Sequence, residues 1–375
     1  MSEVKALLVF CEGSHDIAFV QKILTLCLGF EKMTWKFSEY PSPFNLLFKM
    51  SVQDHASGDL RLEIAHDFFL PNSVLQKSEH LVLLFNSGGS SKTDKVKSLL
   101  KQFLDLLESM NEGILNSEVF FYDTQSVVKE VKYLFLYDAD CSGTTALFKK
   151  IKKDFEVIDK ETKWSFNELN VEDNPFGAIT DDKAAYIWGE NEKTGTLEDI
   201  LLPMFEHDQK VIVDKASQFV DTSFKWEIEA PKLKKKIAEI AKRKKAIITC
   251  IGQRKKPGFS VNVIIDQAKL IKDDTFLQNS SVKSFADFIN KFMCTIQKTI
   301  GVCGGHARIR NTRIPVWTII SLQQQGADNP ELLRNFPSLT ADDLSNVRFY
   351  YTTHQEEIDR AIASHQYEQE EAIIG

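Results

Sequence analysis

The stretch Tyr133-Leu-Phe-Leu-Tyr-Asp-Ala-Asp140 constrains the fold most, because five apolar or aromatic residues run directly into two aspartates. A short apolar run bounded by turn residues is typical of a strand that is buried on both faces of a parallel sheet. In open α/β sheets, ligands bind outside the carboxyl ends of the strands. We therefore expect Asp138 and Asp140 at such an edge, where their i, i+2 spacing lets both side chains point to the same side.

Neighbouring carboxylates of this kind have two interpretations. They repel each other, and a divalent cation relieves the repulsion; alternatively, they start a turn and cap the next helix. A second strand, residues 4–11, favours the cation, because it ends in Glu12-Gly13-Ser14-His15-Asp16. Glu12 follows its strand as Asp138 ends the other, so both are expected at one sheet edge. Asp16 also stands where the N-cap of a helix over residues 17–28 is expected.

Strands and helices alternate along much of the chain, which predicts an α/β fold with a mostly parallel sheet flanked by helices. Residues 81–85 read as another buried strand, and residues 143–155 as a helix, while residues 31–78 are expected to form a loop or short meander. Thr196 is a predicted N-cap, followed by Glu198 and Asp199 in the first helical turn. Acids are favoured there by the helix dipole, yet they also offer carboxylates for a second metal ion.

A strongly basic helix is predicted at residues 232–245, and after one short strand it is followed by Arg254, Lys255 and Lys256. A charged helix face is usually just solvated. The excess of one sign in a chain of net charge −7 instead favours contact with a phosphate backbone, for which we name Lys235, Lys236, Arg243 and Lys244. Residues 261–265 read as a late strand and residues 285–296 as a helix.

The length of 375 residues suits two domains, which we place at residues 1–297 and 298–375. The second reads as a small helical domain with a basic entry that contains Arg308, Arg310 and Arg313. No apolar run is long enough to cross a bilayer and no signal-peptide pattern is present, so we expect a cytoplasmic protein with no membrane partner. The six cysteines form no close pairs and are expected to be reduced.

The ordered set of Glu12-Gly13, Asp16, Asp138-Ala-Asp140 and Ser142-Gly143 resembles the TOPRIM domain, the catalytic module of topoisomerases, bacterial primases and OLD-type nucleases. The resemblance covers roughly residues 4–295 and is nearest to OLD-like, DUF3226-like or DUF4435-like proteins, which implies a TOPRIM-like Rossmannoid fold. In these proteins a glutamate on a later helix helps to bind a second metal, and Glu198 matches it. The chain lacks the ATPase module of full OLD proteins and the tyrosine and zinc motifs of topoisomerases and primases.

The segment Gly305-His-Ala-Arg-Ile-Arg-Asn-Thr-Arg-Ile-Pro-Val316 resembles DUF433, a winged-helix-type domain found in antitoxins. Phe336-Pro-Ser-Leu-Thr340 and Tyr350 with Glu357-Ile-Asp359 extend the match. The family usually has glycine where Asn311 stands; asparagine also tolerates a left-handed turn, so the geometry is expected to be kept.

These observations predict a metal-dependent endonuclease that cleaves phosphodiester bonds in DNA or RNA, including tRNA. The TOPRIM resemblance implies a toxic effector in anti-phage defence and makes Glu12 the general acid/base. Mg²⁺ or Mn²⁺, one or two ions, would be held by acidic side chains: Glu12, Asp16, Asp138, Asp140, Glu198 and Asp199. We also expect a homodimer through the C-terminal domain and a partner ATPase or regulatory protein. The alternatives are a non-catalytic regulator or antitoxin-like binding module and, less favoured, a primase-type polymerase.

Overall fold

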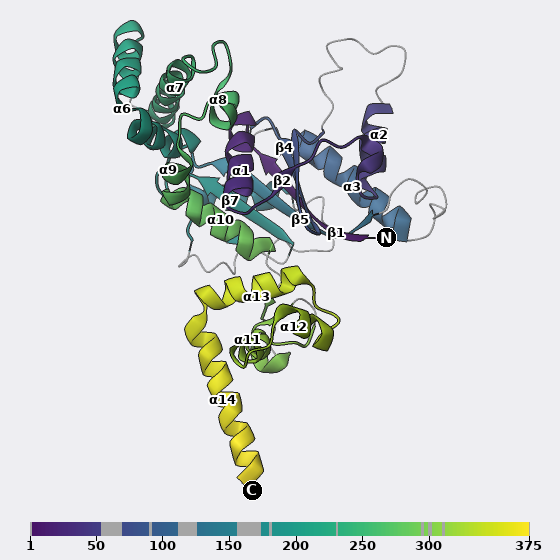
Figure 1. The fold of residues 1–375 in the computed structure, drawn as a ribbon. Helices are drawn as coiled ribbons and strands as arrows, with labels where there is room; N and C mark the ends of the chain where they lie inside the picture. The colour runs from purple at the N-terminus through teal and green to yellow at the C-terminus, as the bar shows by residue number, and fades with distance from the viewer. Residues whose placement is uncertain are drawn as a thin grey trace. The chain divides into compact units, whose positions relative to one another are not determined.

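The computed structural model divides into two units, Met1–Ile289 and Asn290–Gly375, where the sequence placed the boundary at residue 297. It describes ten ranges of the chain, namely residues 2–53, 70–89, 92–111, 126–155, 174–179, 182–229, 232–293, 296–298, 302–309 and 312–374. The two units are described separately below (Figure 1).

The N-terminal unit is built on a seven-stranded sheet with the strand order β2-β3-β4-β1-β5-β7-β6. The four inner strands β4, β1, β5 and β7 are parallel, and the outer pairs β2/β3, β3/β4 and β6/β7 are antiparallel. The strand bounds are β1 Ser2–Cys11, β2 Glu31–Lys32, β3 Ser73–Lys77, β4 His80–Asn86, β5 Ser126–Asp138, β6 Gly177–Ile179 and β7 Lys183–Trp188. The predicted α/β architecture with flanking helices is confirmed, but the sheet was predicted as mostly parallel and is mixed, with three parallel and three antiparallel strand pairs.

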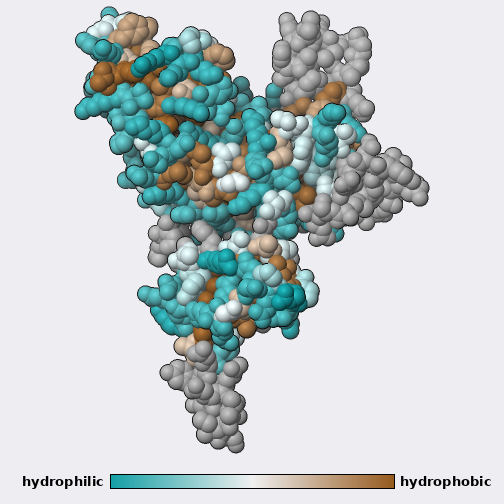
Figure 2. Space-filling model, viewed as in Figure 1, coloured by the Kyte–Doolittle hydropathy of each residue, from teal (hydrophilic) through white to brown (hydrophobic). Residues whose placement is uncertain are grey.

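Helices cover both faces of this sheet (Figure 1). Residues of α2, α3 and α5 share one hydrophobic cluster with β1, β4 and β5, while α1 and α10 pack on the opposite face around Trp188. The helix bounds are α1 Ser14–Leu26, α2 Phe44–Gln53, α3 Asp94–Asn111, α5 Thr144–Phe155, α6 Leu197–Ser223, α7 Leu233–Gly252, α8 Val261–Gln267, α9 Asp273–Gln278 and α10 Ser280–Met293, with a 3₁₀ turn at Phe37–Glu39. On the face drawn in Figure 2, hydrophobic residues come to the surface over α6 and α7.

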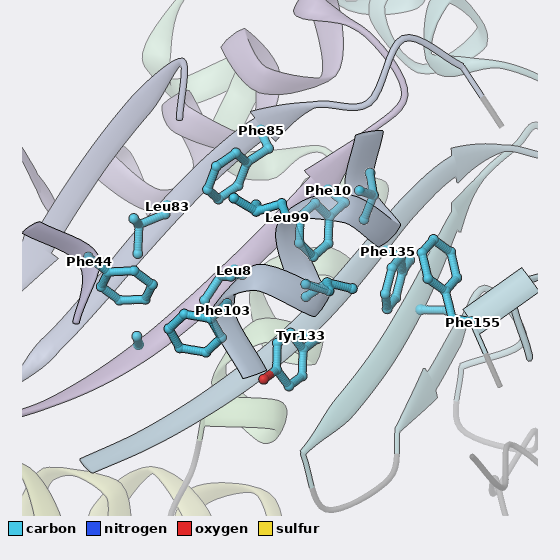
Figure 3. Packing of buried hydrophobic residues seen from close by; sticks show 14 of the residues in the cluster. Leu8, Phe10, Phe44, Leu83, Phe85, Leu99, Phe103, Tyr133, Phe135 and Phe155 are labelled. Atoms are coloured by element: carbon cyan, nitrogen blue, oxygen red, sulfur yellow. The ribbon is translucent and has the colours of Figure 1, made fainter. Parts of the chain in front are cut away.

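Aromatic side chains pack the adjacent inner strands β4, β1 and β5 against one another. The ring of Phe10 stacks on Phe85 at 5.4 Å and on Phe135 at 5.3 Å between centroids, which ties β1 to both of its neighbours (Figure 3). Each fully buried side chain of this size contributes about 1.5–3 kcal/mol through burial. The carboxyl ends of β1 and β5 are therefore held side by side by the core.

Several predicted elements differ from the structure. Residues 261–265 were predicted as a strand from their β-branched residues, but they form α8. The basic helix continues to Gly252 as α7. The short strand predicted before Arg254 is therefore part of this helix. The predicted loop at residues 31–78 contains α2, β2 and β3 among its described residues. The helix expected at residues 285–296 runs from Ser280 to Met293.

The C-terminal unit is mainly helical and has its own hydrophobic core. A small two-stranded sheet, β8 Ile296–Gln297 and β9 Arg308–Ile309, precedes four helices, α11 Val316–Gln324, α12 Asn329–Asn335, α13 Ala341–Thr353 and α14 Gln355–Ile374. Thr340 is the N-cap of α13, and Asp343 completes a capping box with it. Arg310 and Asn311 lie outside the described residues.

Two general expectations concern thiols and membranes. Cys11, Cys27, Cys141, Cys250 and Cys303 are free, and Cys294 lies outside the described residues. In the described part of the chain, no helix combines the length and the apolar character that crossing a membrane requires.

Candidate active site

Glu12 and Asp138 meet at the carboxyl edge of the sheet. The strands β1 and β5 pair in parallel up to Cys11 opposite Leu136, so the residues that follow leave the sheet together. The Oε2 atom of Glu12 accepts a hydrogen bond of 3.0 Å from the backbone N–H of Asp138. Two acids that are distant in the sequence are thus joined directly.

Asp138 also connects this edge to the start of α6. Its Oδ1 atom accepts a hydrogen bond of 2.9 Å from the backbone N–H of Leu197. Burial raises the pKa of Asp138 well above its ordinary value, and the negative charges of Asp16, Glu12 and Glu198 raise it further. Four carboxylates from separate segments of the chain therefore form one cluster, which we call the acidic cluster: Glu12, Asp16, Asp138 and Glu198.

Asp16 lies in the first turn of α1, but Gly13 rather than Asp16 is the N-cap, because the helix begins earlier than predicted. Its Oδ2 atom accepts a hydrogen bond of 2.8 Å from the N–H of Gly13. The other oxygen, Oδ1, is buried and has no hydrogen-bond partner among the described residues. Burial and the charges of Glu12 and Glu198 raise the pKa of Asp16 to about 7.

Glu198 is only 3% exposed and lies beside His15 and Lys245. Its Oε1 atom lies 3.6 Å from Nδ1 of His15 and 3.2 Å from Nζ of Lys245. Burial alone would raise the pKa of Glu198, but hydrogen bonds from His15 and Lys245 outweigh it and lower the pKa to about 2. His15 and Lys245 were not named as site residues; the only signal for them was their place in the Glu12 motif and in the basic helix.

Asp199 has a different role from Glu198, although the two are adjacent. Its Oδ2 atom accepts a hydrogen bond of 2.7 Å from the N–H of Thr196, the N-cap of α6, and its Oδ1 atom pairs with Lys244. Both oxygens are thus occupied by capping and by an ion pair. The structure does not bring Asp199 into the acidic cluster.

Asp140 lies at the exposed rim, next to the acidic cluster. Its backbone has a φ of 47°, in the left-handed region, and it exchanges two hydrogen bonds with Gly195, of 2.8 and 3.1 Å. Burial raises the pKa of Asp140, the charges of Lys234 and Lys245 lower it, and that of Glu198 raises it. Asp140 therefore stands between the acidic cluster and the basic helix α7.

The donor set fits Mg²⁺ or Mn²⁺ by its chemistry. Both ions prefer carboxylate oxygens, and the buried Oδ1 of Asp16 has no partner among the described residues. Burial and the neighbouring negative charges raise the pKa of Asp16 and of Asp138. Within the described ranges, no three ligating side chains are spaced to enclose an ion. Binding therefore requires these carboxylates to rotate toward one another.

The predicted nucleic-acid contacts lie along α7 and the turn after it. Three of them are ion-paired, Lys235 with Glu227, Arg243 with Asp221 and Lys244 with Asp199. Beyond the helix, the Nζ atom of Lys256 lies 3.1 Å from Oε1 of Gln267. In the described part of the chain, Lys236, Arg254 and Lys255 carry no ion pair, and the last two are exposed.

Comparison with known proteins identifies the C-terminal part. The family of proteins of unknown function DUF433 matches residues 296–351. A DUF433 member protein from Anabaena variabilis ATCC 29413 is 47% identical, and the match covers 26% of this chain and 96% of that chain with a TM-score of 0.19. A hypothetical protein from Pyrococcus horikoshii OT3 is 14% identical over 77% of this chain and 95% of that chain, with a TM-score of 0.39. No curated protein matches the chain.

Proposed function

Residues 296–351 belong to the DUF433 family, and we propose that the N-terminal unit that precedes them is a metal-dependent nuclease of the TOPRIM kind. One observation carries the proposal: Glu12, Asp16, Asp138 and Glu198 converge from β1, α1, β5 and α6. Buried carboxylates that raise one another's pKa are unfavourable by themselves and are typical of functional sites.

The arrangement supplies the parts that phosphodiester cleavage needs. Asp16, Asp138 and Glu198 would hold Mg²⁺ or Mn²⁺, with Asp140 at the rim. When bound, the ion supplies water activation and charge neutralisation at the attacking and leaving oxygens. Glu12 is the proposed general acid/base, and the bond from the N–H of Asp138 orients its carboxylate.

The basic helix α7 provides positive charge beside the acidic cluster. Lys244 and Lys245 lie against Asp199 and Glu198, so α7 brings positive charge to the border of the acidic cluster. A phosphate backbone that approaches the cluster would meet these lysines first and would be held beside the carboxylates. The proposed substrate is accordingly a nucleic acid, DNA or RNA.

The direct test is cleavage of plasmid DNA and of tRNA with Mg²⁺ or Mn²⁺. We expect activity that EDTA removes and that Asp138→Ala abolishes. Asp274→Ala, an exposed acid in the first turn of α9, is the matched control and should leave cleavage unchanged. Full activity in Asp138→Ala would refute the mechanism.

A calorimetric titration with Mn²⁺ separates this proposal from the alternative of a non-catalytic regulator. Saturable binding that is lost in Asp138→Ala supports the nuclease, and the absence of binding supports the regulator. The proposed dimer through the C-terminal domain, the partner ATPase and the role in anti-phage defence are further parts of the proposal that this titration does not address.

A further inference from the structure

A small cavity lies beside the acidic cluster, at the carboxyl end of β7. Its volume is about 200 Å³, and it is bordered by the residue before β6, the end of β7, the first turn of α6 and the start of α10: Phe176, Tyr186, Ile187, Trp188, Gly189, Ile200, Ser280, Ser281 and Ser284. Pockets for drug-sized ligands are larger, about 300–1,000 Å³. The cavity therefore suits a ligand group of one or two rings.

Two contacts connect the cavity to the loop that carries Asp138 and Asp140. The backbone N–H of Ala139 donates a hydrogen bond of 2.7 Å to the carbonyl of Trp188. A Cβ atom added to Gly189 would lie 3.2 Å from the Cβ of Ala139, so these two segments pack directly against each other. Ile200, two residues after Glu198, forms part of the wall. A ligand in the cavity would thus be adjacent to the acidic cluster.

The lining combines aromatic rings with uncharged polar groups. The ring centroids of Tyr186 and Trp188 lie 4.9 Å apart, and those of Phe176 and Tyr186 6.5 Å apart. The hydroxyl groups of Tyr186 and Ser284 lie 3.3 Å from each other. None of the residues that line the cavity, all of them described, carries a charge. Such a lining offers no positive charge to a phosphate and suits an uncharged group with an apolar ring.

We propose that the cavity receives a single unpaired nucleobase of the strand held at the acidic cluster. Nucleobases are neutral and planar and carry both donors and acceptors, and proteins that read unpaired bases combine aromatic stacking with hydrogen bonds to base edges. The inference rests on the proposed nuclease function and makes it more specific: cleavage takes place in a single-stranded or unpaired region, next to a base that the cavity accepts.

The first experiment measures base binding without catalysis. Adenosine, guanosine, cytidine and uridine are added separately to the full chain in EDTA, and saturation-transfer NMR detects binding. We expect transfer from the base protons of at least one nucleoside. Ser284→Phe fills the cavity from α10 and should weaken binding by about tenfold or more, as expected when one base can no longer stack in its site.

Lys283→Phe is the matched control, because it places the same side chain on the exposed side of the same helix, and it should bind like the wild type. Ser281→Phe, at another lining residue of α10, provides a second variant if Ser284→Phe does not fold. No transfer to the wild type, or equal binding in all variants, overturns the inference.

The second experiment maps cleavage positions on a mixed-sequence single strand and on the same strand with an abasic position at the preferred site. The wild type should prefer one base beside the cut and should lose that cut at the abasic position, and Ser284→Phe should lose the preference. If nucleosides bind but no nucleic acid is cleaved, base binding in the cavity is supported and the nuclease proposal is refuted. If Ser284→Phe cleaves with the same base preference as the wild type, the nuclease proposal is supported and base binding in the cavity is refuted.

Discussion

The Oε2 atom of Glu12 lies 3.0 Å from the backbone nitrogen of Asp138, although the two residues are 126 positions apart. The contact depends on the parallel pairing of β1 and β5. It also brings the charge of Glu12 close to the carboxyl group of Asp138. Burial and this charge both raise the pKa of Asp138. Removing the charge of Glu12 should therefore lower the pKa of Asp138.

Asp138→Asn is expected to remove metal binding without destabilising the metal-free fold. Asparagine keeps an oxygen that can accept the N–H of Leu197, and it removes a carboxyl group whose ionised form burial and the neighbouring acids disfavour. In EDTA the melting temperature should be equal to or above that of the wild type. At a Mn²⁺ concentration of about 100 times Kd, the wild type should gain about 2.7 kcal/mol, and the variant should gain almost nothing. Thermal denaturation with EDTA and with Mn²⁺ measures both melting temperatures. A variant that melts at a lower temperature than the wild type in EDTA would contradict the proposed repulsion among the carboxylates.

The stability of the metal-free protein is expected to fall as the pH rises from about 4 to about 7. The pKa of Asp16 is raised from 3.8 to about 7, so the folded state binds the proton more tightly than the unfolded state. This contribution to stability is complete below the unfolded pKa and is lost as the pH passes the folded pKa. Its upper bound is on the order of 4 kcal/mol. Denaturant unfolding in EDTA at several pH values should show this slope, and Asp16→Asn should flatten it.

Metal affinity should change in the opposite direction, because Mn²⁺ binds the ionised carboxylates. Binding measured by calorimetry should tighten between about pH 5.5 and 8 in the wild type, and less so in Asp16→Asn. An affinity that does not depend on pH over this range would exclude Asp16 and Asp138 as ligands.

Lys245→Met is expected to have opposite effects on the two ligands. It removes the cation 3.2 Å from Oε1 of Glu198, so the pKa of Glu198 should rise from about 2 and Mn²⁺ should meet less competition and bind more tightly. Nucleic-acid affinity should fall because a positive charge is lost. Since the Lys245 side chain is 47% exposed, the stability change should stay below about 1 kcal/mol. Lys242→Met, which breaks only the surface pair with Glu239, should change neither affinity.

The exposed cations after α7 should contribute to the salt dependence of nucleic-acid binding. Arg254→Gln with Lys255→Gln is expected to reduce the slope of log K against log salt by about one for each phosphate that the variant no longer neutralises. Lys149→Gln with Lys153→Gln on α5 neutralises two exposed lysines elsewhere and should leave the slope unchanged. Fluorescence anisotropy at several salt concentrations measures the slopes, and equal slopes in both double variants would remove Arg254 and Lys255 from the interface.

The DUF433 part can be destabilised on its own. Asp343, 1% exposed, accepts hydrogen bonds from the N–H and the hydroxyl of Thr340, so Asp343→Ala should cost about 1–2 kcal/mol in the C-terminal unit. Glu356→Ala breaks an exposed i, i+4 pair and should cost less than about 0.5 kcal/mol. Because the acidic cluster lies within Met1–Ile289, neither change should alter Mn²⁺ binding; a loss of binding would contradict this independence.

Local sequence patterns predicted the part of the site that depends on strand ends. The apolar runs before Glu12 and Asp138 are long enough to identify buried strands. Parallel pairing of these two strands then brings their carboxyl ends together. The secondary structure of α8 was predicted wrongly because Val261, Ile264 and Ile265 are β-branched. The residues that are buried there, at i, i+3 and i+4, instead follow a helical period.

Contacts between distant segments could not be predicted in the same way. Glu198 and Asp199 are adjacent and chemically similar, and the sequence offered both as metal ligands. Only the tertiary structure shows that Asp199 closes the cap of α6 while Glu198 faces His15 and Lys245. These roles depend on the direction in which α6 leaves the sheet, which no local pattern encodes.

The order of the segments along the chain has a consequence for biosynthesis. Translation produces Glu12 and Asp138 well before Leu197, whose amide anchors the Asp138 carboxylate, and Glu198 is made directly afterwards. A polypeptide that stops short of α6 lacks both the anchor and the fourth acid. If the cluster acts as proposed, incomplete copies of the protein would have no nuclease activity. The cell that synthesises them would then be protected from cleavage of its nucleic acids until α6 is complete.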